Sequence, residues 1–117
     1  MLLSGSSDST IRVWNPDENY KLVITLTGHT DSVLSLLQLS NGMLLSGSSD
    51  NSIRVWNPDN YYKLVTTLSG YTKRGRLLEL SNGMLVSVGD PKNMIEDGLE
   101  GTMRVWNPSD NYRLVLL

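Results

Sequence analysis

The side chains best suited to chemistry in this sequence surround its only histidine, His29, which lies in a chain rich in serine and aspartate. A serine hydroxyl, an imidazole and a carboxylate in hydrogen-bonding contact form the triad of many hydrolases, in which the serine is the nucleophile. The glycine pattern of the sharp turn that carries such a serine is missing here. A structural role for His29, held by polar neighbours, is therefore the favoured interpretation.

The carboxylates are numerous enough for acid–base catalysis, but most of them lie in turn-like segments, where capping or solvated roles are usual. They are Asp8, Asp31, Asp50, Glu79 and Asp90. The chain contains no cysteine, which excludes disulfides and thiolate metal sites. It also contains no metal-binding, phosphate-binding or nucleophile motif. We therefore expect neither an enzyme nor a bound cofactor or metal.

Charge and hydropathy limit the classes of partner. The ten basic and twelve acidic residues are scattered, and the formal net charge of -2 offers no field that would hold nucleic acid or an anionic membrane. No segment approaches the roughly 18 apolar residues that span a bilayer, and residues 1–20 lack the features of a signal peptide. We expect a soluble chain, cytoplasmic by default, that binds neither nucleic acid nor membranes.

The elements that position these side chains are repeated along the chain. Residues 1–17 (MLLSGSSDSTIRVWNPD) are nearly identical to residues 43–59 (MLLSGSSDNSIRVWNPD). A third copy begins at Met84 and ends at Pro108, with an insertion near 89–100. The chain has no phenylalanine and no alanine, a bias that copying of one short unit produces.

A second block recurs between these copies, at residues 20–42 and 62–83, and its start closes the chain at 112–117. Each full unit therefore contains four short runs of β-branched or leucine-rich residues, separated by Ser, Gly, Asn and Asp. The Asn-Gly pairs at 41–42 and 82–83 predict two-residue hairpin turns in which both residues take positive φ. The pattern predicts an all-β chain of four-stranded antiparallel units of about 42 residues.

The middle copy, with Gly-His at 28–29, SGSSD at 46–50 and IRVW at 53–56, resembles the Trp-Asp (WD) repeat family of β-propellers. The resemblance extends over nearly the whole chain. It implies propeller blades, each held by a hydrogen-bonded set of histidine, serine or threonine, aspartate and tryptophan. In the middle copy the matching residues are His29, Ser46, Asp50 and Trp56.

The other two copies match this set less well. Their matching residues are Ser4, Asp8 and Trp14 in the first copy, and Ser87, Glu100 and Trp106 in the third. Tyr71 stands where the family has its histidine, and Glu100 where it has the turn aspartate. The aspartate that follows tryptophan in the family is replaced by Asn15, Asn57 and Asn107, which still permits side-chain hydrogen bonding at a turn. We expect the third blade to be the least rigid or the most specialised.

The strand count leaves the propeller open. In the family's order, the first copy supplies three strands and the other two supply four each, which makes about 2.75 blades of an incomplete ring. The blades would be residues 1–26, which lack the innermost strand, then 33–68, and 75–117 with the insertion near 89–100. Exposed blade faces should prevent a stable monomer. The chain is then part of a larger propeller, half of a ring of two chains, or a unit of an open assembly.

The resemblance implies a non-enzymatic protein-interaction scaffold. The alternative is a self-assembling structural protein, a homo-oligomer whose partner is a further copy of itself. Contacts with a partner protein are expected in the inter-blade loops and the insertion, because loops vary on a fixed scaffold. These residues are Tyr71, Lys73, Arg74, Arg76, Met94, Ile95 and Glu96. A salt contact between their basic members and the acidic insertion is favoured over an anion site, and the insertion is equally well interpreted as a solvated loop without a role.

Overall fold

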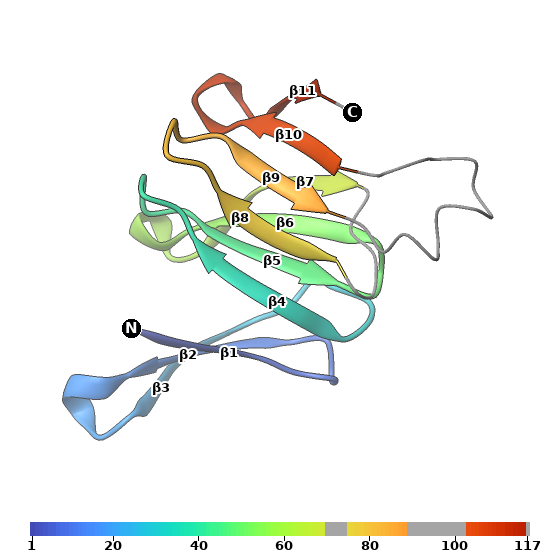
Figure 1. The fold of residues 1–117 in the computed structure, drawn as a ribbon. Helices are drawn as coiled ribbons and strands as arrows, with labels where there is room; N and C mark the ends of the chain where they lie inside the picture. Colours follow the sequence, from blue (N-terminus) through green and yellow to red (C-terminus); the bar gives the residue numbers. More distant parts are fainter. Residues whose placement is uncertain (70–74, 89–102, 117) are drawn as a thin grey trace.

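The computed structural model describes residues 1–69, 75–88 and 103–116, and in these ranges the strands form three antiparallel sheets (Figure 1). The first sheet contains β1 (Leu2–Gly5), β2 (Ile11–Asn15) and β3 (Lys21–Leu26). The second sheet contains β4 (Val33–Gln38), β5 (Leu44–Ser48), β6 (Ser52–Asn57) and β7 (Lys63–Ser69). The third sheet contains β8 (Arg76–Glu79), β9 (Leu85–Val88), β10 (Met103–Asn107) and β11 (Arg113–Leu116).

The predicted all-β class and open array of blades are confirmed. Strands that follow one another in the chain are neighbours in each sheet, and the described ranges contain no α-helix. Figure 1 shows the sheets stacked in chain order, from the blue first sheet to the orange and red strands of the third, without closure into a ring. The first sheet has β1 at its edge, with no fourth strand beside it.

The three sheets share one register. A leucine at the start of one strand pairs with the tryptophan of the next strand, as Leu2 with Trp14, Leu44 with Trp56, and Leu85 with Trp106. We call the side of each sheet that carries this pair the Trp face. The opposite side, the Val face, carries the valine that precedes each tryptophan, because neighbouring residues of a strand point to opposite faces. These valines are Val13, Val55 and Val105.

The core lies between the sheets, where each Val face packs on the Trp face of the next sheet. Between the first and second sheets, Ile11 and Val13 pack in one cluster with Leu44 and Trp56. Between the second and third sheets, the cluster includes Leu45, Ile53, Val55, Leu85 and Trp106. A single sheet has two apolar faces and no core of its own, so burial of these faces against a neighbour supplies the main stabilisation.

The Asn-Gly turns differ from the expected two-residue type. Gly42 has a φ of 93°, but Asn41 does not have a positive φ. Leu39 N donates to Met43 O over 2.8 Å, and Gly42 N donates to Leu39 O over 2.9 Å. The prediction was wrong because the loop contains one more residue: Ser40 and Asn41 make an ordinary turn, and only the glycine takes the left-handed conformation. The hydrogen bonds of Leu80 and Gly83 repeat this arrangement in the third sheet.

At the same end of the sheets, a single turn of 3-10 helix connects the last two strands of each sheet. These turns are η1 (Pro16–Glu18), η2 (Pro58–Asn60) and η3 (Pro108–Asp110). Each begins after an asparagine whose side chain accepts a hydrogen bond from the backbone, as Asn57 does from Asp59 N. Two residues with positive φ follow each helix, and in the second sheet these are Tyr61 and Tyr62.

Candidate functional site

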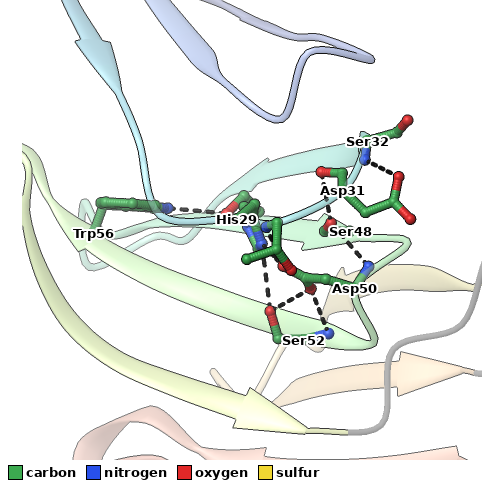
Figure 2. A network of polar contacts seen from close by, with 9 residues as sticks. His29, Asp31, Ser32, Ser48, Asp50, Ser52 and Trp56 are labelled. Carbon is green, nitrogen blue, oxygen red and sulfur yellow. Dashed lines mark hydrogen bonds and ion pairs between the residues drawn. The ribbon is translucent and has the colours of Figure 1, made fainter.

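The largest group of hydrogen-bonded polar side chains in the second sheet lies around His29 and Asp50 (Figure 2). His29 lies in the segment between β3 and β4, while Ser46 is on β5 and Trp56 on β6. Asp50 lies in the turn between β5 and β6, and Ser52 begins β6. The repeated register brings Ser46 and Trp56 to the same face, so the segment that carries His29 closes over both of them.

The hydrogen bonds of this group form one continuous chain from Trp56 to Asp50, in which each group donates to the next. Trp56 Nε1 donates to Ser46 Oγ over 2.9 Å, and Ser46 Oγ lies 2.7 Å from His29 Nε2. His29 Nδ1 lies 2.9 Å from Asp50 Oδ2. The indole only donates and an ionised carboxylate only accepts, so the His29 proton is assigned to Nδ1 and the Ser46 hydroxyl donates to Nε2.

Asp50 is held as an ionised acceptor at the end of this chain of contacts. Its Oδ2 atom accepts a hydrogen bond from Thr30 N, and its Oδ1 atom accepts from both the backbone and the hydroxyl of Ser52. Burial acts to raise the pKa of Asp50, but the hydrogen bonds from Ser52, Thr30 and His29 outweigh it and hold the pKa below its usual range. The carboxylate therefore fixes both the turn and the histidine.

Burial lowers the pKa of the His29 imidazole and so favours its neutral form, although Asp50 beside it acts in the opposite direction. The side chain of His29 is almost entirely enclosed. A Cβ atom on Gly28, which precedes it, would lie 2.5 Å from Arg54 Nη1, so the end of the Arg54 side chain would have to move. Gly28 also has a φ of 142°, a conformation in which other residues are strained. The backbone conformation at this position therefore favours glycine.

Ser46, His29 and Asp50 have the connectivity of a hydrolase triad, but the serine is inaccessible. Ser46 is completely buried, and its oxygen already receives the indole N–H of Trp56. A nucleophilic serine must reach a carbonyl carbon of its substrate, which a hydroxyl enclosed between two sheets cannot do. The arrangement is suited to holding strands together, because every polar hydrogen of the set has an acceptor.

The first and third sheets contain only part of this set. Trp14 Nε1 donates to Ser4 Oγ over 3.0 Å, and Trp106 Nε1 donates to Ser87 Oγ over 3.1 Å. Asp8 contacts no histidine. It instead accepts hydrogen bonds from Thr10 and Arg12, and the Thr10 contacts are the main cause that lowers its pKa. Glu100 and Tyr71, assigned to the third set from the sequence, lie outside the described residues.

Most of the residues expected to contact a partner also fall outside the described ranges. These are Tyr71, Lys73, Arg74, Met94, Ile95 and Glu96, together with the rest of the insertion. Arg76 is described: it is exposed, begins β8 and pairs in register with Val88. Arg76 therefore lies at the same end of the sheets as the segment that carries His29, and we call this the His29 end.

Two serines of the polar set were not singled out from the sequence. Ser48 is completely buried, with its hydroxyl donating to Asp31 O and accepting from Asp50 N, and Ser52 contacts both Asp50 and His29. The sequence did carry a signal for them: the first copy has Ser6 and Thr10 at the equivalent positions. A hydroxyl residue two positions before and two positions after the turn aspartate marks both turns.

Two surface cavities repeat at the boundaries between neighbouring sheets. A cavity of about 420 Å³ lies between the first and second sheets, and one of about 360 Å³ between the second and third. Val23 and Pro58 line the first, and Val65 and Pro108 occupy equivalent positions in the second. Since the lining recurs, the cavities follow from sheet stacking. In the described ranges, no group of acidic and histidine side chains is arranged as a metal site, and no helix is long and apolar enough to cross a membrane.

Comparison with known proteins identifies a family model and solved structures that resemble this chain. The family model "WD domain, G-beta repeat" matches residues 1–15 and 20–57. No curated protein matches the chain. Among solved structures, the crystal structure of the WD40 repeats of RRP9 and the structure of U3-55K are each 29% identical to it, with a TM-score of 0.72. The alignment covers 97% of this chain and 32% of each of those chains.

Proposed function

We propose that this chain, which is similar in sequence and structure to WD repeat proteins, is a non-enzymatic scaffold that binds other proteins. The observation that carries the proposal is the burial of Ser46 and His29, the two groups that could otherwise act as nucleophile and base. Both are committed to holding the second sheet. The surface of the fold consists of turns, strand edges and sheet faces, which are features that commonly bind other proteins.

In this proposal the three sheets are propeller blades, formed by residues 1–26, 33–68 and 75–117. The chain spans 32% of the length of the two similar structures, so further blades are required to complete a ring. The first blade lacks its innermost strand, and an additional segment would pair with the exposed edge of β1.

We place the contact with a partner protein at the His29 end of the sheets. Both β7, which ends at Ser69, and β9, which ends at Val88, lead to this end, where the second and third sheets are adjacent. The proposed contact residues, Tyr71, Lys73, Arg74, Arg76, Met94, Ile95 and Glu96, follow those strands in the sequence. Aromatic and arginine side chains are over-represented among residues that dominate binding energy, which supports this choice.

The test is a binding measurement on a purified partner. Proteins captured by the immobilised chain are identified, and one is purified and titrated against the wild type, Arg76→Glu and Lys63→Glu. Lys63 is exposed at the opposite end of the sheets and provides the same change in charge. We expect Arg76→Glu to weaken binding by at least about tenfold and Lys63→Glu to leave it unchanged. Equal affinities for the three proteins would contradict the proposed contact.

A second candidate function is self-assembly into a structural homo-oligomer. It is favoured by the outermost sheet faces, which expose residues whose counterparts are buried between the sheets. A scaffold and an assembly are compatible, because the sheet faces and the His29 end are different surfaces.

A further inference from the structure

The Trp face of the first sheet is exposed, whereas the same face of the other sheets is covered. Leu2 is 49% exposed, but its counterpart Leu44 is only 1% exposed. Tyr20 is likewise exposed, while its counterpart Tyr112 in the third sheet is buried. Since the three sheets have the same register, the difference in exposure comes from the preceding sheet, which covers the Trp face of the second and third sheets but not that of the first.

The Val face of the third sheet shows the complementary pattern. Leu80, directly after β8, is 39% exposed, while its counterpart Leu39 in the second sheet is 3% exposed. Met103 is exposed where the second sheet has the fully buried Ile53. Within the described residues, the third sheet therefore ends the stack with a face that exposes Leu80 and Met103, although Val86 in the middle of that face is only 5% exposed. The first sheet begins the stack with an exposed Trp face.

Positions at the outer edge provide an internal control. Val23, Val65 and Val115 are equivalent residues of β3, β7 and β11, and they are 49%, 49% and 48% exposed. Their exposure does not depend on the position of the sheet in the stack. The exposure of Leu2, Leu80 and Met103 is thus specific to faces that lack a neighbour.

We propose that the Val face of the third sheet binds the Trp face of the first sheet of a second copy of this chain, head to tail. This proposal specifies the second candidate function and rests on it. The side chains that cover the Val face of the first sheet are those of Leu44 and Trp56, and Leu2 and Trp14 have the same types in the same register.

The first sheet also holds its tryptophan as the covered sheets do. The bond from Trp14 Nε1 to Ser4 Oγ is 3.0 Å long, against 2.9 Å for Trp56 and 3.1 Å for Trp106. The indole is therefore already oriented for stacking, although no sheet covers it. The surface that fits the uncovered Val face thus exists on the chain itself.

The contact joins two different surfaces, so it is heterologous: each copy contributes its first sheet to one contact and its third sheet to another. Two copies supply six sheets, a number within the range of closed propellers. If the rotation between copies does not close a ring, the same contact produces a longer chain of copies. Both products depend on the same pair of faces.

The experiment blocks the two faces separately in the 117-residue chain. Leu2→Lys places a charge on the Trp face of the first sheet, and Leu80→Lys places one on the Val face of the third. Val65→Lys makes the same kind of change at the outer edge and serves as the control. Tyr20→Lys and Met103→Lys provide a second variant for each face. Circular dichroism confirms the fold of each variant, and sedimentation velocity at micromolar concentrations gives the mass.

We expect the wild type and Val65→Lys to associate, and Leu2→Lys and Leu80→Lys to be monomers when each is alone. An equimolar mixture of Leu2→Lys and Leu80→Lys should form a one-to-one dimer, because each variant keeps the face that the other has lost. That dimer should neither close nor grow.

A monomeric wild type would overturn the proposal. So would association that persists in Leu2→Lys or Leu80→Lys alone, which would mean that like faces meet or that other surfaces are used, and so would a mixture that stays monomeric. These measurements contain no partner protein, so they are independent of the binding test with Arg76→Glu. Failure of self-assembly would leave the scaffold proposal standing.

Discussion

The Oγ atom of Ser46 lies 2.7 Å from His29 Nε2 and 2.9 Å from Trp56 Nε1, so one hydroxyl joins three segments of the chain. It accepts a hydrogen bond from the indole N–H and donates one to the imidazole. Both partners are buried, and neither has water as an alternative. The stability of the second sheet should therefore depend on this hydroxyl more than on a surface serine.

Removal of this hydroxyl should destabilise the protein. Ser46→Ala leaves the Trp56 N–H and the His29 Nε2 atom without partners, at a cost of about 1–3 kcal/mol for each buried group. We expect the free energy of unfolding in urea to fall by at least about 2 kcal/mol. Ser4→Ala is the matched control, because Ser4 accepts the same bond from Trp14 but is exposed, and it should cost less than about 1 kcal/mol. Equal losses would contradict the account.

Stability should decrease on mild acidification because of His29. Burial lowers the pKa of its imidazole below the value of about 6.5 in an unfolded chain. Below that value the unfolded chain binds a proton that the folded protein does not, so the free energy of unfolding falls as the pH decreases. The loss levels off once the folded imidazole is also protonated. Urea unfolding from about pH 8 to about pH 5 measures this slope.

The variant His29→Asn is the control for the acid effect. His29 is the only histidine, and no other side chain has an ordinary pKa in this window. We expect the slope to disappear in His29→Asn. A slope that persists unchanged would show that another group titrates. The loss of stability connected with Asp50 belongs to lower pH, since the pKa of that carboxyl is held below its usual range.

Substitution of one residue in the turn after β6 should stabilise the folded protein. Tyr61 has a φ of 52° and is 90% exposed, so its ring adds little packing to offset a left-handed conformation. The equivalent residues of the other sheets are Asn19 and Asn111, a residue type that adopts this conformation more readily. We expect Tyr61→Asn to increase the free energy of unfolding by about 0.5–1 kcal/mol. The reverse change, Asn19→Tyr, should decrease it, and a loss of stability in Tyr61→Asn would contradict the argument.

The sequence predicted the fold well because the fold is repeated. Each copy has the same alternation of apolar and turn residues, so the strands assigned in one copy are supported by the same pattern in the others. The turn at Asn41 and Gly42 was the exception. Its two-residue form was inferred from the residue pair alone, but the loop length depends on where the strands stop pairing, and Ser40 lies outside the ladder.

The polar set was predictable in its members but not in its accessibility. His29, Ser46, Asp50 and Trp56 were identified from the resemblance, yet the sequence did not show that Ser46 is enclosed between two sheets. Exposed faces at the ends of the incomplete ring were expected, but exposure was not assigned to Leu2, because the sequence around Leu2 matches that around the buried Leu44. Identical segments acquire different surroundings from their place in the stack, which is a property of tertiary structure alone.

Ser46 is held by structural hydrogen bonds, and we propose that this chain binds other proteins without catalysing a reaction. A fluorophosphonate reacts with a nucleophilic serine, forming a phosphorus–oxygen bond with loss of fluoride, and the adduct is detected by the mass of the intact protein. We expect no adduct on the folded wild-type chain after prolonged exposure to the reagent. A stoichiometric adduct at Ser46 that disappears in His29→Asn would contradict it.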